Sequence, residues 1–358
     1  MKYPILNEVA VSKEMTNTFG GYVHKDTINE GEFYDTKNIT TEFFPLIASR
    51  HKRGILKTFT NLQGIIDKDT LAWVDNGQLY INNVQKSLAA GVTLSTTGGK
   101  QLCKMGAYIV IFPDKVWYNT KDDTSGYMDA IKTYNQATNV TFSMVKSDGT
   151  NITLWSGTGT PPDGAYKIDV VDGKASLKVY SAITSMWVNV ATTYMKISVS
   201  GIGAQFSKGD GVKITADFTG VSWPRANDIF VNNEGNGKRS SNFAIFDQGN
   251  DYITVTGLLD VATKAVQVRS MSVERKAPDI AYVCECQNRL WACSQDGHEI
   301  YCCKLGDVKN WNYFTGVSID SYAATVGSDG KFTGATTYNL NPIFFKEDTW
   351  LKVSVSAN

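Results

Sequence analysis

A strand–turn–strand pattern recurs at both ends of the 358-residue chain and is missing from its middle. In each copy an apolar or aromatic strand leads into a tight turn that carries an aspartate, and a second strand ends in aromatic or aliphatic residues. The four copies are Leu71 to Ile81, Ala107 to Tyr118, Arg289 to Cys303 and Asn341 to Val353. Hairpins that recur every ~40–50 residues are typical of β-propeller blades. Because a single blade cannot bury both of its faces, the repeat favours several blades that pack on one another.

The middle of the chain carries a different β pattern. From Val140 to about Arg275, several segments alternate apolar and polar residues, as half-buried antiparallel strands do. Short glycine-containing turns separate these segments. We therefore expect an all-β protein, a β-propeller that is interrupted by an inserted β-sandwich-like domain.

The expected organisation has four parts. These are an N-terminal arm at residues 1–59, a first propeller part at 60–122, the inserted β domain at 123–277 and a second propeller part at 278–358. Within the insert, Asp129 to Ala137 is interpreted as a short helix. No closing partner follows the last strand. Either the N-terminal region supplies a closing strand or the chain is part of a longer, here incomplete, propeller.

Charge and hydropathy exclude some classes of protein. Lys+Arg and Asp+Glu are both 35, so the formal net charge is zero, which argues against a chain that grips nucleic acid along its whole length. No apolar window approaches ~18 residues, so we expect no membrane insertion. The start of the chain lacks the pattern of a secretory signal. The sequence fits a protein kept in a cytosol, and equally a particle assembled there and later released.

The cysteines are concentrated in one predicted hairpin, which holds Cys284, Cys286, Cys293, Cys302 and Cys303. A zinc site usually has C-x2-C knuckles or nearby histidines, whereas the spacing here is C-x-C on a strand with only one histidine close by. We expect buried free thiols, and we predict neither a metal nor a cofactor.

Catalytic signatures are missing. G-x-S-x-G, H-E-x-x-H and the P-loop pattern do not occur. Gly201 and Gly203 start like a dinucleotide turn, but Phe206 stands at the position of the third glycine, and strands surround the segment. We therefore predict no catalytic residues.

Two sets of residues are candidates for contact and for packing. The basic run of Arg50, His51, Lys52 and Arg53 has two interpretations: a solvated loop, or contact with an acidic neighbour or a phosphate backbone. We expect the arm to dock on a neighbouring subunit because it carries Tyr22, Phe33, Tyr34, Phe43 and Phe44 without a hairpin pattern that could bury them. The predicted blade core consists of Trp73, Trp117, Trp291, Trp311, Phe344 and Phe345.

The blade segments also carry a resemblance to a known family. Asn288 to Cys293 (NRLWAC), followed by Leu305 to Trp311 (LGDVKNW), resembles a blade pattern of tailed-bacteriophage tail proteins. Pro342 to Asp348 looks like the next blade of that family. The opening of the family is similar to Glu30 to Asn38, then Phe44-Pro45-Leu46 and Arg53-Gly54. The family comprises tail stabilisation, hub or nozzle proteins, and the resemblance covers both propeller parts. Its members generally carry more blades than this chain.

The resemblance implies a non-enzymatic virion structural protein of a tailed phage or prophage. Such a tail hub or nozzle subunit would be assembled in the host cytoplasm and located in the virion tail. Its partners would be further copies in a homo-oligomeric ring, portal or adaptor and other tail proteins, and DNA that passes through the channel without sequence recognition.

Two other functions stay open at this point. One is a propeller module with a lectin-like insert that binds glycans or a host surface. The other is an enzyme on a propeller scaffold, such as a glycosidase. That enzyme would need two carboxylates ~5–10 Å apart in a cleft, and the sequence nominates no such pair.

Overall fold

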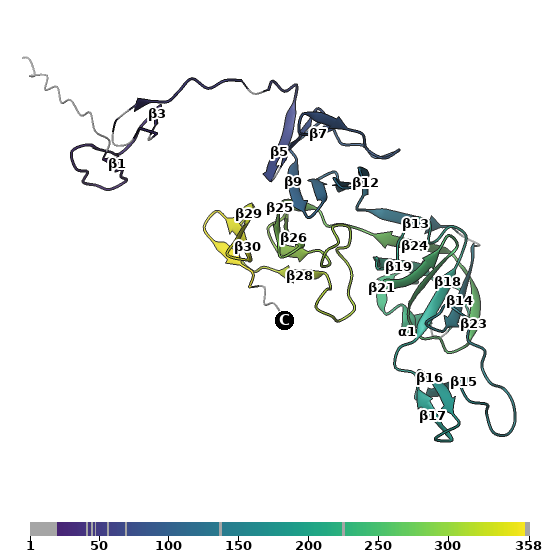
Figure 1. Cartoon of the computed structure of the whole chain (residues 1–358). Coiled ribbons are helices and arrows are strands. Elements are labelled where there is room, and N and C mark those ends of the chain that lie inside the picture. The colour runs from purple at the N-terminus through teal and green to yellow at the C-terminus, as the bar shows by residue number, and fades with distance from the viewer. Residues whose placement is uncertain are drawn as a thin grey trace, which may run out of the picture. The chain divides into compact units, whose positions relative to one another are not determined.

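A computed structural model describes residues 20–40, 42, 43, 46, 48–55, 57–68, 70–135, 138–223 and 226–354. This part of the chain is all-β apart from one short helix, α1 (Ala226–Ile229), so the all-β part of the predicted fold is confirmed (Figure 1). Contacts divide the chain into two units, Met1–Phe59 and Thr60–Asn358, and each unit is described by itself.

The first unit contains very short ladders. Strand β1 (Gly21–Tyr22) pairs in parallel with β2 (Glu32–Phe33), and β3 (Ile39–Thr40) pairs antiparallel with β4 (Ala48–Ser49). The His24 ring stacks on Tyr34 with 4.2 Å between centroids. Tyr22, Tyr34 and Phe43 are exposed. Phe44 and Pro45, which belong to the predicted motifs of the arm, lie outside the described residues.

The second unit contains four small antiparallel sheets, here called the sheet array. The first sheet consists of β5 (Leu62–Lys68), β6 (Thr70–Asp75), β7 (Gln78–Ile81) and β8 (Val84–Lys86). The second consists of β9 (Gln101–Met105), β10 (Tyr108–Phe112), β11 (Val116–Asn119) and β12 (Thr124–Tyr127). The third consists of β25 (Ile280–Cys286), β26 (Arg289–Ser294), β27 (Glu299–Cys302) and β28 (Tyr322–Thr325). The fourth consists of β29 (Phe332–Tyr338), β30 (Asn341–Lys346) and β31 (Trp350–Lys352).

In each sheet of the array, every strand pairs with its neighbour in sequence. The four predicted hairpins are confirmed as β6–β7, β10–β11, β26–β27 and β30–β31. Asn76 and Gly77 both have positive φ, of 48° and 73°, which is the conformation that a two-residue hairpin turn requires.

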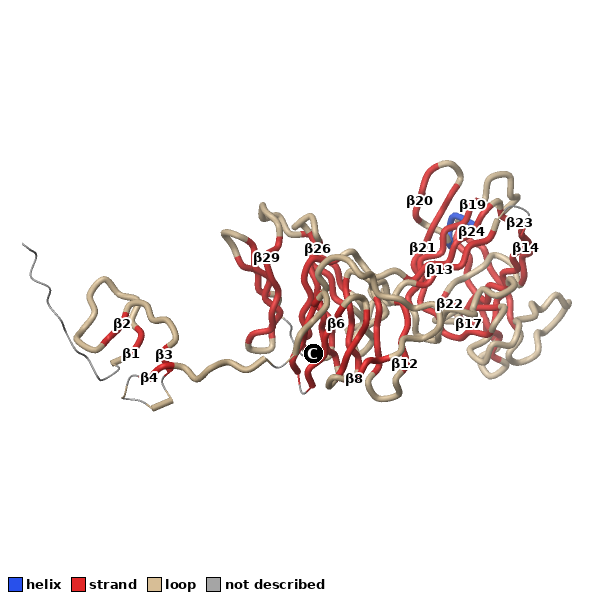
Figure 2. Tube along the Cα trace, turned by 90° about the horizontal axis from the view of Figure 1, so that it is seen from above, coloured by secondary structure: helices blue, strands red, loops and turns tan. Residues whose placement is uncertain are grey.

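The sheets of the array follow one another through their first strands. Strand β5 contacts β9, β9 contacts β25, and β25 contacts β29. Figure 2 shows the array from above, with β29 of the fourth sheet next to β26 of the third. The second sheet lies between the third sheet and the first, to which β6 belongs. The sequence order of the four sheets is therefore also their order in space.

Each neighbouring pair of sheets shares an apolar core, which we call the first, second and third seam in chain order. Alternation along β10 sends Ile109 and Ile111 into the first seam, and Val110 and Phe112 into the second. Strand β26 alternates in the same way: Leu290 and Ala292 enter the second seam, and Trp291 and Cys293 enter the third. The second and third sheets are therefore buried on both faces.

Four of the six predicted core residues lie in or against these seams. Trp291 and Phe344 are buried in the third seam and Trp311 in the second, where the half-buried Trp117 packs against it. Trp73 is buried and stacks on Tyr80. The prediction for Phe345 is wrong: its side chain is 40% exposed. Because neighbouring strand residues point to opposite faces, burial of Phe344 in the seam turns Phe345 outward.

The insert between the second and third sheets contains a nine-stranded antiparallel sheet. Its strands are β13 (Ala130–Tyr134), β14 (Thr138–Val145), β18 (Tyr194–Ser198), β19 (Gly211–Asp217), β20 (Asn232–Gly235), β21 (Lys238–Gly249), β22 (Tyr252–Thr256), β23 (Thr263–Val268) and β24 (Ser270–Arg275). The long strand β21 carries a bulge between Ile245 and Asp247 and pairs with β19 along one part and β22 along the other. Residues from both halves of the sheet enclose one core.

A three-stranded antiparallel sheet follows β14 in the chain, formed by β15 (Tyr166–Val171), β16 (Lys174–Ser181) and β17 (Met186–Asn189). It lies near α1 at one end of the nine-stranded sheet (Figure 1). This small sheet exposes much apolar surface.

Two expected boundaries need correction. The first propeller part was expected to end at residue 122, but β12 pairs with β11 and extends the second sheet to Tyr127. The predicted helix that begins at Asp129 is instead strand β13, which pairs with β24. The polar turn at residues 121–123 connects two strands of one sheet, so it is not a domain boundary.

We expect a sharp contrast in stability between neighbouring residues of β30. Phe344→Ala, and equally Trp291→Ala, removes a buried aromatic ring from the third seam and should lower the free energy of unfolding by ~3–5 kcal/mol. Phe345→Ala should lower it by less than about 1 kcal/mol because its ring is largely solvated. Denaturant unfolding of the three variants measures this difference. Equal losses at the two phenylalanines would contradict the assigned strand faces.

Candidate functional site

A pocket of about 560 Å³ lies where the first strands of the sheet array come together. Its lining includes residues from all four sheets or from the loops beside them: Gln63, Lys100, Gln101, Ile280, Lys331 and Phe332. We call it the central pocket. Sites where several elements converge are frequent ligand positions, so its polar groups need individual inspection.

Most polar groups in the central pocket are engaged in structural bonds. The buried Lys100 ammonium donates to Ser95 Oγ at 2.8 Å and forms an ion pair with Asp114. The Gln63 amide donates to the carbonyl oxygens of Ser95 and Gly98, and its own oxygen accepts from Gly77 N. The Gln63 bonds tie the first sheet to the loop before β9, and the Lys100 ion pair ties the end of that loop to the β10–β11 turn.

The other polar side chains that line the central pocket are two neutral amides, the Tyr282 phenol and one lysine. Gln101, Gln295 and Lys331 are exposed at its rim. Among the described residues that line it, none is Asp or Glu, so a glycosidase pair of carboxylates has no place there. These polar side chains can form hydrogen bonds to a polar ligand.

A second polar site joins the insert to the third sheet, and we call it the junction. The buried Asp210 carboxylate, just before β19, forms an ion pair with Arg275 at the end of β24. Its other oxygen accepts from the Asn310 amide at 3.0 Å. Arg275 also donates through Nε to the Met128 carbonyl at 2.9 Å. The junction thereby connects both chain crossings of the insert to the array.

The junction uses residues of the LGDVKNW segment. Asn310 donates to Asp307 at 2.6 Å and to Asp210, and it accepts from Gly211 N at 2.8 Å. Lys304 donates to the Gly209 carbonyl at 2.7 Å. At Gly211 a β-carbon would lie 2.6 Å from the Asn312 carbonyl oxygen, so the close approach of the two backbones requires glycine. The segment therefore has a structural task, which is to hold the insert.

Sequence reasoning missed the charged half of this junction. Asp210 and Arg275 are far apart in the sequence, and neither stands in a motif. The sequence carries one weak signal, because the aspartate stands between two glycines, Gly209 and Gly211, at the start of β19. The pairing itself is a property of the tertiary structure.

Removal of one charge should destabilise the junction strongly. Asp210→Ala leaves the Arg275 guanidinium buried without its partner, and we expect a loss of ~3–5 kcal/mol in the free energy of unfolding. Lys276→Ala is the matched control, because it removes the neighbouring but exposed cation that pairs with Glu274 at 2.9 Å. That control should cost less than about 1 kcal/mol. Comparable effects of both substitutions in denaturant unfolding would refute the assigned role of the junction.

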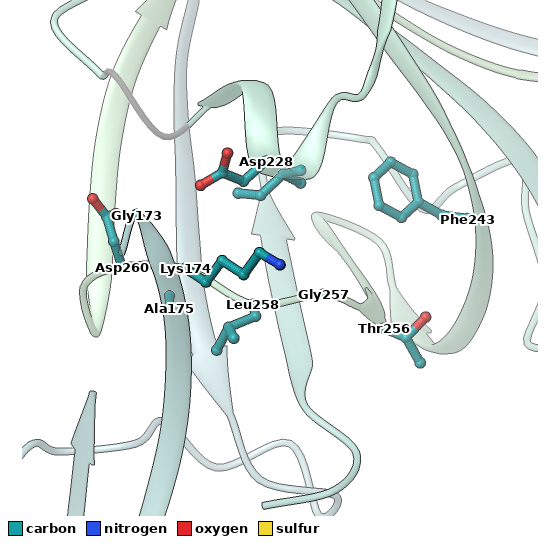
Figure 3. A pocket seen from close by; sticks show the side chains of 10 residues that line it. Gly173, Lys174, Ala175, Asp228, Phe243, Thr256, Gly257, Leu258 and Asp260 are labelled. Atoms are coloured by element: carbon teal, nitrogen blue, oxygen red, sulfur yellow. The ribbon is translucent and has the colours of Figure 1, made fainter. Parts of the chain in front are cut away.

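The insert has a pocket of its own, of about 550 Å³, between β16, α1 and the segment after β22. Figure 3 shows the Lys174 side chain reaching into it between Asp228 and Leu258. Phe243 and Ile229 contribute apolar lining, and Asp260 accepts a 3.4 Å hydrogen bond from the Trp223 indole. We call it the insert pocket. Carboxylates, an ammonium group and apolar surfaces together can recognise a polyhydroxylated ligand.

The basic run lies in the first unit and is fully open to solvent. Arg50, His51, Lys52 and Arg53 are all exposed. The His51 imidazole lies 3.5 Å from the Glu42 carboxylate, and both side chains are largely solvated. The run therefore presents cationic groups at the surface of the first unit.

The cysteines are free thiols and all six are buried. Burial raises the pKa of Cys284 to about 12 and that of Cys293 to about 11. Thiols with such pKa values stay protonated near neutral pH and are poor metal ligands and nucleophiles. In the described part of the chain, no group of three His, Cys, Asp or Glu side chains could hold a metal ion. The absence of a bound metal stays a prediction.

None of the described helices is long and apolar enough to cross a membrane. No protein-family model matches the chain, and no curated protein matches it either. The assignment of a function therefore depends on the geometry described above.

Proposed function

We propose that the chain is a non-enzymatic structural subunit of the tail of a tailed bacteriophage or prophage, a hub or nozzle protein. It would form a homo-oligomeric ring around the channel through which DNA leaves the virion. The junction carries this proposal. Asp307 and Asn310 belong to the segment that resembles tail-protein blades, and their bonds hold the insert. A motif whose residues make structural hydrogen bonds is consistent with a structural subunit of an assembly.

The sheet array supports the finer proposal that it is part of a β-propeller. Its sheets are meanders of three or four strands, their first strands are neighbours, and its interior sheets bury both faces. Propeller blades combine these three features. Solution scattering of the protein could distinguish a compact radial arrangement from an extended stack.

The insert offers a surface for contact with a neighbouring tail protein, such as a portal or adaptor. The small sheet β15–β17 exposes several apolar side chains, and Ile183 in its β16–β17 turn is 96% exposed. Val170, Val171, Met186 and Val188 of the same sheet are also exposed. They lie on both of its faces, because Val170 and Val171 are consecutive on β15. Clustered apolar groups on a surface sheet are typical of interaction sites.

The first unit supports a second contact. Its exposed aromatic side chains and the basic run of residues 50–53 combine the residue types that are enriched at interfaces. An acidic face of a neighbour or a phosphate backbone would complement the cations.

Deletion of residues 1–53 should separate folding from assembly. We expect the truncated protein to keep the melting temperature of the second unit, because its seams lie wholly within residues 60–358. We also expect it to lose the ring that the full chain forms. Electron microscopy and light scattering measure the ring, and calorimetry measures folding. A truncated protein that forms the same ring, or that no longer folds, would disprove the role of the arm.

A matched pair of charge variants refines this test. The triple substitution Arg50→Glu, Lys52→Glu and Arg53→Glu reverses the basic run, whereas Lys121→Glu, Lys146→Glu and Lys238→Glu changes the same charge at exposed positions elsewhere. Only the first variant should weaken ring formation, and more so at low salt, since exposed charges are screened by ions.

The insert pocket favours a second candidate function, that of a glycan-binding module. Its volume, its two aspartates, Lys174 and its apolar lining fit a monosaccharide-sized ligand. This function and the first are compatible in one tail protein, but either can hold without the other.

Glycan binding can be measured directly. If the insert pocket takes saccharides, a glycan array should give hits, and titration calorimetry with a hit should show affinity that falls about tenfold or more in Lys174→Ala. Lys238→Ala serves as the control, since this exposed lysine lies outside the pocket. An empty array, or equal affinity in both variants, would remove the glycan proposal.

A further inference from the structure

The two ends of the sheet array present outward faces of similar chemistry. In the first sheet, Ile65, Trp73 and Tyr80 are direct cross-strand neighbours and form one row. This row faces away from the first seam, because Ala72, Val74 and Leu79 occupy the seam side of the same strands. The exposed fraction differs along this row: Trp73 is 1% exposed in the single chain, whereas Ile65 is 51% exposed.

The fourth sheet ends in a comparable row. Phe345 and Trp350 are paired directly across β30 and β31, and Gly334 of β29 lies opposite Phe345. Phe344 and Leu351 point into the third seam, so Phe345 and Trp350 lie on the outer face. Trp350 is 61% exposed. Two large aromatic side chains thus form a solvated patch on the last sheet.

The outer face of the first sheet carries an acidic residue, and the outer face of the fourth sheet carries a basic one. Asp67 lies two residues beyond Ile65 on β5, and Lys352 lies two residues beyond Trp350 on β31. Residues two apart on a strand share a face, so each apolar row has one charge beside it. Both charged residues are exposed. The first sheet thus offers an acid beside an aliphatic and aromatic row, and the fourth offers a base beside an aromatic pair.

The three seams define how sheets of this chain meet. In each seam, the apolar face of one sheet packs on the apolar face of the next, and the first strands are neighbours. A fourth contact of the same kind would join the outer face of the fourth sheet to the outer face of a first sheet. Within one chain these faces leave Ile65 and Trp350 exposed, so they do not cover each other.

We propose that the outer face of the fourth sheet docks on the outer face of the first sheet of a second copy of this chain. Phe345 and Trp350 pack against the Ile65 row, and Lys352 meets Asp67. The inference rests on the ring proposed above and names the surface that builds it. Because the two faces are different, the contact is heterologous, and it produces a closed ring where the rotation closes or an open chain where it does not.

Single-cysteine variants test the geometry of this contact. Ile65→Cys and Phe345→Cys are purified separately, mixed and treated with a short bismaleimide. The native thiols are buried, so the unsubstituted protein is the blank. We expect covalent dimers only in the mixture of both variants. No mixture-specific dimer, in a protein that still forms rings by electron microscopy, would overturn this inference and leave the proposed ring intact. A full chain that is monomeric at all concentrations would overturn both.

Exchange of charges supplies an independent test. Asp67→Lys and Lys352→Asp should each weaken association about two- to five-fold at low salt, and the double variant should restore it. Phe345→Ser with Trp350→Ser should weaken association by more than about tenfold without a change in melting, since both rings are solvated in the single chain. Lys121→Asp, on the β11–β12 turn of the same array, is the control and should have no effect. Additive losses without restoration would refute the pairing of Asp67 with Lys352.

Discussion

Each interior sheet of the array has to bury two faces, and this requirement shapes much of the second unit. Strand β10 meets it with a run of consecutive apolar residues, so that Ile111 enters one seam and Phe112 the next. Strand β26 does the same with Trp291 and Ala292. Strands of this kind cannot be stable alone in water, because either face is costly to expose. The order of the sheets and the position of the central pocket between their first strands follow from this two-sided packing.

The insert interrupts this packing between the second and third sheets without disturbing it. Strands β13 and β24, where the chain enters and leaves the insert, are paired with each other, and Ala130 lies opposite Arg275. The Arg275–Asp210 ion pair lies beside that crossing and is satisfied further by Asn310. A buried ion pair contributes little net stability compared with apolar packing, yet it is very sensitive to the loss of one partner. It therefore favours one orientation of the insert over others.

The sequence predicted local features well and tertiary features poorly. The four hairpins were evident because turn residues such as Asn76 and Gly77 and the flanking apolar strands act within a few residues. The face of Phe345 was misassigned because two consecutive phenylalanines look equally apolar until the strand register is known. The pairing of Asp210 with Arg275 and the convergence of four strands at the central pocket could not be predicted, since both depend on segments distant in sequence. The LGDVKNW segment was recognised as a motif, but its bonds to the insert were visible only in three dimensions.

The paired crossing at Ala130 and Arg275 also bears on how such a chain can evolve. The two ends of the insert are held together there, so the entropic cost of closing the chain between them varies only with the logarithm of its length. Additions or deletions far from the crossing therefore alter the stability of the sheets outside it only slightly. A lineage could exchange nearly all of the intervening polypeptide, and with it the surface shown to the surroundings, as long as the aspartate, arginine and asparagine at its base were retained.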